Sequence, residues 1–181
     1  MKKNVSDVTL ELISGDIVAQ EDITAVVNAA NAQLRIGGGV AGAIHRAAGP
    51  GLEEETAPLA PIKPGEAVIT SGNKLPNKYV IHCLGPVYGV DKPEDKLLSD
   101  CYRNALKLAE ENRIDSIAFP AISTGAFGYP MKEAARVAFT TIIDLVPVLE
   151  YCRKIRFVLF SDRDREVHED VLSDYLARRN G

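Results

Sequence analysis

The sequence predicts a three-layer α/β/α sandwich with a mixed central sheet. Short apolar, β-branched runs such as 24–27 and 116–122 alternate with longer segments whose apolar residues recur at helical spacing. Such alternation is typical of a sheet covered by helices on both faces. Glycine-rich loops follow two of the expected strands. Ligands bind at the carboxyl ends of strands in this class of sheet, so the two loops are the candidate site.

The composition indicates one globular domain that spans residues 1–181, with 46% hydrophobic and 25% charged residues. A net charge of −4 argues against binding of a nucleic-acid backbone, which needs a basic face. Cys83, Cys101 and Cys152 are widely spaced and form no CxxC pair. This spacing argues against a disulfide framework or a metal site, and it favours a reducing cytoplasm. We expect no cofactor, and no apolar run is long enough for a membrane partner.

The first half of the chain alternates strands with short helices. The expected elements are a strand at 8–13, a short helix or turn at 17–22, a strand at 24–27, helices at 40–48 and 52–57, and strands at 67–71 and 79–83. Gly49-Pro50 is expected to end the helix at 40–48, and Ala43, Ile44, Ala47 and Ala48 are expected to form its buried face. His82 lies on a strand and is expected to be a hydrogen-bonded core residue.

The second half follows the same alternation. The expected elements are a long amphipathic helix at 97–109, a strand at 116–122, a helix that opens near Met131 and is ended by Pro147, a strand at 156–160 and a helix at 167–176. Asp16, after the first strand, is expected to cap a helix. Phe160 ends the last strand, where a core phenylalanine is expected, although its ring could instead pack on an adenine.

The first glycine-rich stretch runs from Asn28 to His45 and contains Gly37-Gly38-Gly39. Three consecutive glycines cost backbone entropy and supply no packing. They are explained if the backbone bends sharply or if a ligand approaches it closely. The free N–H groups and the dipole of the following helix suit an anion. A plain glycine-rich connector is the alternative.

The second glycine-rich stretch is Ser123-Thr124-Gly125-Ala126-Phe127-Gly128-Tyr129-Pro130, which links a strand to a helix. Hydroxyls, glycines and helix-start N–H groups again suit a phosphate. One such loop is weak evidence for a phosphate site. Two of them in one small domain predict a diphosphate that is held from two sides.

Several ordered motifs resemble those of the macrodomains, the ADP-ribose-binding modules, and in particular the MacroD-type or Appr-1''-p processing branch. The motifs are Gly15-Asp16-Ile17, Asn28-Ala-Ala-Asn31, Gly37-Gly-Gly-Val40, Gly65 to Thr70, Tyr79 to His82 with Gly85-Pro86, and Pro120 to Gly125 with Phe127 to Pro130. They cover nearly the whole chain. The resemblance implies that the chain recognises ADP-ribose, mono-ADP-ribosylated proteins or related metabolites.

The resemblance also implies roles for single residues. The two loops would clasp the diphosphate, Asn31 would bind the distal ribose, and Asp16 beside the Ile17 backbone would accept a hydrogen bond from the adenine amino group. The implied ligand-binding residues are Asp16, Ile17, Asn31, Gly37, Gly38, Gly39, Val40, Ser123, Thr124, Gly125, Ala126 and Phe127, to which the strand-end position adds Phe160.

Catalysis is the point at which the sequence departs from the resembling hydrolases. They carry an Asp ten residues after the ribose-binding Asn, and this chain has Ala41 there. Asn31 is therefore the main catalytic candidate, and His45, one helical turn beyond Ala41, is a substitute base or a packing residue. Three functions compete: an ADP-ribose-binding module, an ADP-ribosyl hydrolase or O-acetyl-ADP-ribose deacetylase with weak activity, and a Rossmann-type NAD enzyme. The third rests only on Gly37, Gly39 and Gly42, which formally fit G-x-G-x-x-G.

Overall fold

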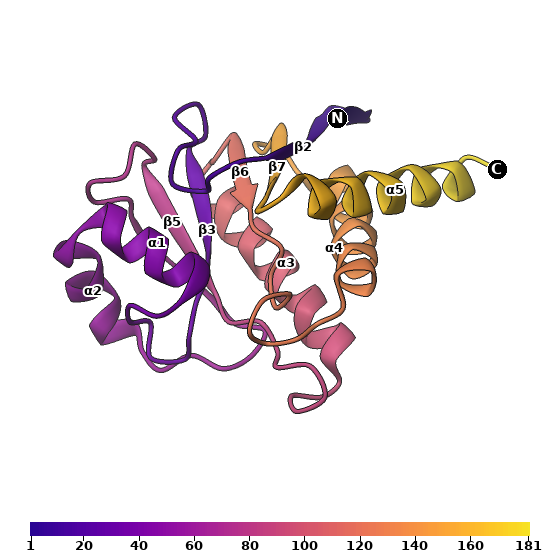
Figure 1. Cartoon of the computed structure of the whole chain (residues 1–181). Helices are drawn as coiled ribbons and strands as arrows, with labels where there is room; N and C mark the ends of the chain where they lie inside the picture. The colour runs from indigo at the N-terminus through magenta and orange to yellow at the C-terminus, as the bar shows by residue number, and fades with distance from the viewer.

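A computed structural model that describes residues 1–181 has the expected three layers, with a seven-stranded mixed sheet between two groups of helices (Figure 1). The strands are β1 (Lys2–Val5), β2 (Val8–Ser14), β3 (Ala25–Ala29), β4 (Ala67–Ser71), β5 (Tyr79–Cys83), β6 (Ser116–Phe119) and β7 (Lys154–Leu159). Their order in the sheet is β1-β2-β7-β6-β3-β5-β4. The central strands β2, β7, β6, β3 and β5 run parallel, and the edge strands β1 and β4 run antiparallel to their neighbours.

The helices divide between the two faces of the sheet, as Figure 1 shows. They are α1 (Gly39–Ala48), α2 (Pro50–Thr56), α3 (Glu94–Glu111), α4 (Met131–Leu145) and α5 (Asp162–Arg179), with 3-10 turns at Ala57–Leu59 and Val146–Val148. On β3, Ala25 and Val27 join a core of 32 buried residues beneath α3, α4 and α5, whereas Val26 joins a core of 10 beneath α1 and α2. Successive strand residues point to opposite faces, so the apolar residues 25–27 of this strand serve both cores.

The face beneath α3, α4 and α5 holds most of the aromatic side chains. Phe157 on β7 lies 5.7 Å from Phe119 and 5.1 Å from Phe139, measured between ring centroids. Tyr102 on α3 lies 5.0 Å from Phe119. Offset and tilted aromatic pairs at these separations add stability beyond the area that they bury. This packing fixes β6 and β7, and with them the loops that leave their carboxyl ends.

Three local details of the structure differ from the sequence prediction. Strand β1 was not expected, because its side chains are mostly exposed and only its backbone pairing with β2 defines it. Strand β6 ends at Phe119 because Pro120 follows it and cannot donate to the ladder. Residues 17–22 form turns, which is one of the two alternatives that the sequence left open. On α1, Ala47 is exposed, and Ala41 and His45 complete the buried face instead.

None of the helices has both the length and the apolar character needed to cross a membrane. Cys83, Cys101 and Cys152 are all free and buried. Burial raises the pKa of the Cys101 and Cys152 thiols to about 12, which keeps them protonated and unreactive at neutral pH.

Candidate functional site

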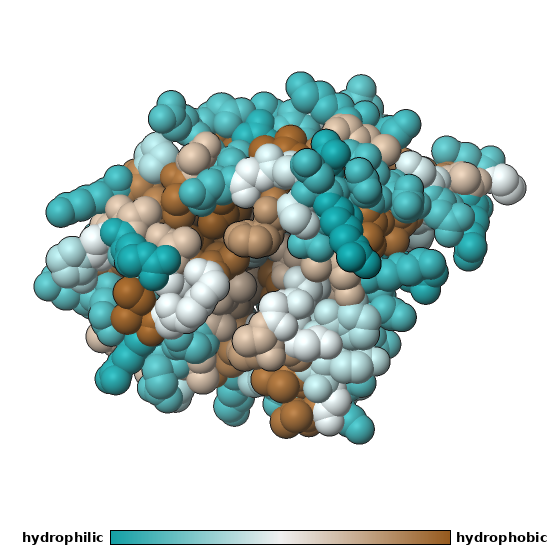
Figure 2. Space-filling view, in the orientation of Figure 1, coloured by the Kyte–Doolittle hydropathy of each residue, from teal (hydrophilic) through white to brown (hydrophobic).

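Both glycine-rich loops leave the same edge of the sheet. Strands β3, β6 and β7 are parallel neighbours, so the segments after Ala29, Phe119 and Leu159 all emerge at their carboxyl ends. The middle of the face seen in Figure 2 is hollowed, with brown and pale residues inside it and teal residues around its margin. The sequence prediction that the loops share one edge is therefore confirmed.

The first loop offers an unbroken run of free backbone donors. None of the N–H groups of residues 36–41 donates to a protein acceptor. Gly38 precedes α1 in an extended conformation and no side chain caps the helix. Gly39 has φ of 55°, a left-handed conformation that favours glycine. Free N–H groups at the positive end of a helix dipole form an anion site.

Asn31, Gly37 and Ala41 converge at the base of this loop. The Asn31 side chain closes the preceding turn, because its Nδ2 donates to Arg35 O at 2.8 Å and its Oδ1 accepts from Arg35 N at 3.0 Å. A Cβ atom on Gly37 would lie 3.1 Å from Asn31 Nδ2 and 3.8 Å from Ala41 Cβ. Ala41, which stands where the resembling hydrolases carry an Asp, is therefore next to Asn31, the residue to which the resemblance assigns the distal ribose.

The second loop is closed by its own hydrogen bonds. Tyr129 N donates to Ser123 O at 2.9 Å, Gly128 N donates to Gly125 O at 3.0 Å, and Thr124 Oγ1 donates to Ala121 O at 2.7 Å. The N–H groups of residues 125–127 are left without a protein acceptor. Three successive unpaired N–H groups on a fixed turn are suited to an anion.

Ser123 and Phe127 fasten the second loop to its surroundings. Ser123 has φ of 68°, and its Oγ is buried without a partner. Phe127 packs against a small core that includes Ala30 and Leu34 from the first glycine-rich stretch. The two loops are thus joined by direct packing.

Gly85, to which the sequence analysis assigned no role, lies directly against the second loop. A Cβ there would overlap Ser123 Oγ and lie 2.7 Å from Ile122 Cγ2. Tyr88 N, three residues later, donates to Phe127 O at 2.9 Å. The segment after β5 therefore contacts the second loop and fixes its position. The Gly85-Pro86 pair in the sequence was the signal that could have indicated this role.

Asp16 and Phe160 lie at the ends of the neighbouring strands β2 and β7. Asp16 Oδ1 accepts from Val18 N at 3.1 Å, which makes a turn and corrects the expectation of a helix cap. Ile17 is buried beside it. The Phe160 side chain is 96% exposed, so the expectation of a core phenylalanine was wrong. An exposed aromatic ring and a carboxylate at one strand edge could hold a planar, amino-bearing ring between them.

An ion-pair network holds the turn that follows Asp16. Arg156 Nε donates to Glu11 Oε2 at 2.7 Å, and its two terminal nitrogens donate to both carboxylate oxygens of Asp22 at 2.8 and 2.7 Å. Arg156 also donates to Gln20 Oε1 at 2.9 Å. The hydrogen bonds from Arg156 lower the pKa of Asp22 to about 2. The residue pattern gave no sign of this network, because its members are far apart in sequence.

Two of the three histidines, His45 on α1 and His82 on β5, lie close together between the helix and the sheet. His82 is hydrogen-bonded to Asn28 Nδ2 at 3.1 Å and to Thr70 Oγ1 at 2.9 Å, and burial lowers its pKa to about 3. It is therefore the hydrogen-bonded core residue that the sequence predicted, and it is neutral at neutral pH. The His45 ring centroid lies 6.5 Å from that of His82, its Nε2 is buried without a partner, and burial lowers its pKa. No His, Cys, Asp and Glu side chains gather into a group that could hold a metal ion.

A family model for the Macro domain matches residues 27–138. The chain belongs to the Macro domain family. A Macro domain-containing protein of Chlorobaculum tepidum is 47% identical over 168 residues, which cover 92% of this chain and 97% of the relative. An O-acetyl-ADP-ribose deacetylase of Klebsiella pneumoniae is 44% identical over 170 residues, which cover 91% of this chain and 97% of the relative.

Solved macrodomain structures superpose on the whole fold. The Oceanobacillus iheyensis macrodomain with ADP has a TM-score of 0.91 and 41% identity, and the match covers 99% of this chain and 97% of that one. A point mutant of the same protein, with ADPR, has a TM-score of 0.90 over 98% of each chain. The sheet order and its antiparallel edges also differ from the all-parallel order of a Rossmann fold, so this macrodomain is not a Rossmann-type NAD enzyme.

Proposed function

We propose that this macrodomain binds ADP-ribose, either free or attached to a protein or to a small metabolite. The observation that carries the proposal is the pair of unpaired N–H runs, residues 36–41 and 125–127, at the carboxyl ends of the neighbouring strands β3 and β6. A diphosphate between them would accept charge-assisted hydrogen bonds from both sides. Such binding needs no basic face, which agrees with the net charge of −4.

The rest of the ligand would lie along the same edge. We place the adenine between Phe160 and Asp16, with its amino group donating to the Asp16 carboxylate. The distal ribose would lie at Asn31, where an amide offers both a donor and an acceptor to ribose hydroxyls. Asn31 now uses its amide on Arg35, so binding would exchange or share these hydrogen bonds. Macrodomain structures with ADP and with ADPR support this assignment by similarity.

Calorimetric titration tests the proposal directly. We expect ADP-ribose to bind much more tightly than NAD, because the nicotinamide of NAD occupies the position of the free distal hydroxyl beside Asn31. ADP should bind with intermediate affinity, because it keeps the diphosphate and the adenine. Equal affinities for ADP-ribose and NAD would overturn the placement of the distal ribose, and no binding of ADP-ribose would overturn the proposed function.

Hydrolysis is the second candidate function, and relatives named O-acetyl-ADP-ribose deacetylase favour it. Removal of ADP-ribose from a protein requires a water held against C1″ of the distal ribose, whereas deacetylation requires a water held against the ester carbonyl on that ribose. Both reactions need stabilisation of the charge that develops. The loops and Asn31 would position the ribose, which by itself lowers a barrier. The methyl group of Ala41 cannot accept a proton or orient a water. We therefore propose slow hydrolysis, with a water held by the ligand's own phosphate.

The setting of this activity follows from the three free, buried thiols, which favour a reducing compartment. We propose that the protein acts in the cytoplasm as one domain, residues 1–181, on ADP-ribosylated proteins or on ADP-ribose metabolites. Fluorescent-fusion imaging and limited proteolysis check these two statements.

A further inference from the structure

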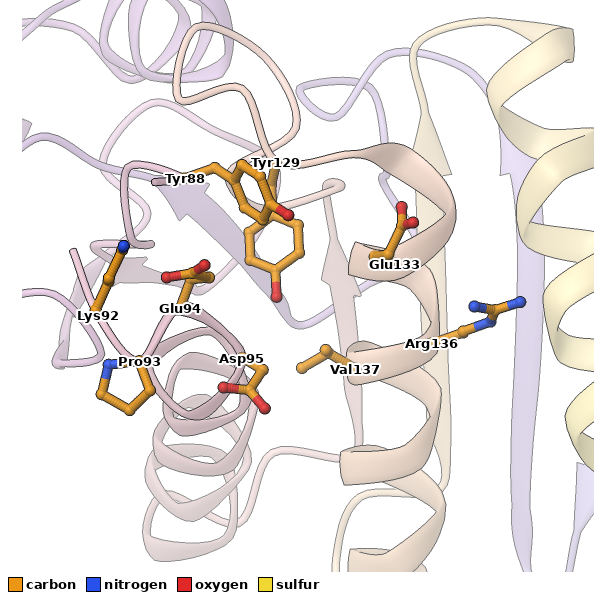
Figure 3. Close-up of a pocket in the computed structure, with 9 residues that line it drawn as sticks. All are labelled: Tyr88, Lys92, Pro93, Glu94, Asp95, Tyr129, Glu133, Arg136 and Val137. Atoms are coloured by element: carbon orange, nitrogen blue, oxygen red, sulfur yellow. The ribbon is translucent and has the colours of Figure 1, made fainter. Parts of the chain in front are cut away.

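Unpaired polar groups occur in two places around the proposed site, and only one of the two lacks access to water. A hollow between the amino-terminal ends of α3 and α4 (Figure 3) is lined in part by Lys92, Asp95, Glu133 and Arg136, all of them exposed residues. Water satisfies such groups, and the ring of Tyr129 beside them belongs to the main core. Beneath α1, by contrast, two polar side-chain atoms are closed off from solvent and make no hydrogen bond.

A chain of directed hydrogen bonds crosses β3, β5 and β4 beneath α1. Asn28 Nδ2 donates to His82 Nδ1 at 3.1 Å, and His82 Nε2 donates to Thr70 Oγ1 at 2.9 Å. Thr70 Oγ1 in turn donates to Ser71 O at 3.1 Å. The direction of the chain is set by Asn28, because an amide nitrogen only donates and the neutral His82 ring then carries its proton on Nε2. The chain leaves Asn28 Oδ1 as a buried acceptor without a partner.

His45 provides the group that matches this acceptor. The residue is 5% exposed, and its Nε2 is the second buried atom without a partner beneath α1. Its ring centroid lies 6.5 Å from that of His82, so both rings border the same polar patch. Burial lowers the pKa of His45, and its ring is therefore neutral at neutral pH and carries one proton. An imidazole protonated on Nε2 is a donor, whereas Asn28 Oδ1 is an acceptor.

Asn28 and His45 stand on the two elements that form the proposed distal-ribose site. Asn28 precedes Asn31 by three residues on the segment that leaves β3, and His45 follows Ala41 by one helical turn on α1. Apolar packing between α1 and the sheet, such as that of Ile44 in the core of 10 buried residues, is non-directional. A hydrogen-bonded link would fix the rotation of α1 relative to β3, because hydrogen bonds depend on angle as well as on distance.

We propose that one buried water joins His45 Nε2 to Asn28 Oδ1 and that this link makes both of them positioning residues for Asn31. The water would accept from the imidazole and donate to the amide oxygen, which satisfies both buried atoms. His45 is then neither a substitute base nor a packing residue alone, because it holds the first loop and Asn31 at a fixed separation. The inference rests on the proposed function, since the positioned group is the one assigned to the distal ribose.

Long-range proton–nitrogen NMR spectra of the histidine rings test the network without any ligand. At neutral pH we expect the nitrogen shifts of a neutral, Nε2-protonated ring for both His45 and His82. His168 is the internal control with the opposite tautomer, because its Nδ1 lies 2.8 Å from the Asp164 carbonyl oxygen and must donate to it. A ring of His45 or His82 that is protonated on Nδ1 would overturn the network.

Calorimetry with ADP-ribose tests the positioning role. Asn28→Ala and His45→Leu each remove one end of the link, so each should weaken binding about tenfold. The double variant should bind no more weakly than either single variant, because the link is broken only once. His45→Gln keeps an amide donor and should restore most of the affinity. His168→Leu is the matched control, a buried histidine replaced in the other core beside Phe139, and it should leave the affinity unchanged.

Three results of the titrations would overturn the positioning role. The first is unchanged affinity in His45→Leu. The second is additive losses in the double variant, which would show that Asn28 and His45 act separately. The third is that His45→Gln binds as weakly as His45→Leu, which would leave only packing. A native protein that does not bind ADP-ribose would overturn the proposed function and the positioning role together, whereas the ring nitrogen shifts would still decide whether the network exists.

Discussion

The two glycine-rich loops both offer free backbone N–H groups, but they differ in how firmly the rest of the protein holds them. In the loop of residues 36–41, no backbone N–H group donates a hydrogen bond within the protein. The loop of residues 123–129, by contrast, is closed by three hydrogen bonds and by the packing of Phe127. The second loop is therefore shaped before a ligand arrives. The first loop must give up more conformational freedom on binding, which costs free energy. The proposed diphosphate site thus combines one rigid loop, residues 123–129, with one adaptable loop, residues 36–41.

Glycine serves opposite purposes in the two loops. At Gly125 a Cβ would meet no atom within 4 Å, so the glycine keeps space open for a ligand. At Gly42, just behind the first loop, a Cβ would overlap the Gly37 carbonyl oxygen and lie 2.8 Å from Arg46 Nη1. That glycine lets α1 approach the loop. Substitutions at the two positions should therefore separate binding from stability.

Gly125→Val should have the largest effect on binding and should abolish the calorimetric signal for ADP-ribose. A Cβ at this position would meet no protein atom within 4 Å, so we expect the valine side chain to fill the space in front of the free N–H groups. Thermal unfolding should stay close to that of the native protein. Unchanged affinity would show that the second loop is not at the ligand.

Ala41→Asp should raise the hydrolysis of mono-ADP-ribosylated protein by ~10²–10⁴-fold, the usual range for a general base. The new carboxylate would stand at the start of α1 beside Asn31 and Gly37, where the helix dipole stabilises it. Single-turnover release of ADP-ribose at saturating enzyme measures the effect. A fast native protein with no gain in the variant would assign the chemistry to another group, with His45→Ala as the next test.

Asp16→Ala should weaken ADP-ribose binding by roughly 1.5–3 kcal/mol, the value of a charge-assisted hydrogen bond, which is about 10- to 150-fold. It removes only an exposed hydrogen bond to Val18 N, so stability should change little. Both loops remain intact in this variant, which makes it the control for loop damage. A large fall in melting temperature with unchanged affinity would make Asp16 a structural residue alone.

Gly42→Ala should have the smallest effect on affinity, about tenfold, and should destabilise the fold by ~1–3 kcal/mol through overpacking. The clash is with the backbone of the adaptable loop, which must shift. Chemical denaturation measures the stability, and Gly125→Ala is the matched glycine control that should leave it unchanged. Equal stability of the two alanine variants would refute the contrast between the loops.

The sequence predicted the layers, both loops and their common edge because periodicity and glycine placement are local signals. It missed the network of Arg156, Glu11 and Asp22, because those side chains meet only after β2 and β7 pair. It favoured a core position for Phe160, which was wrong, because a strand-end phenylalanine has the same sequence context whether it is buried or exposed.

The free N–H groups of the first loop have a practical consequence for any measurement on this protein. Sulfate, phosphate and sulfonate buffers offer the same acceptor oxygens as a diphosphate, and they are present at far higher concentration than a titrated ligand. By mass action each would occupy residues 36–41 and lower the apparent affinity for ADP-ribose in proportion to its own occupancy. Affinities measured in chloride and in phosphate buffers should therefore differ, and the size of the difference would measure how strongly the empty loop binds a simple anion.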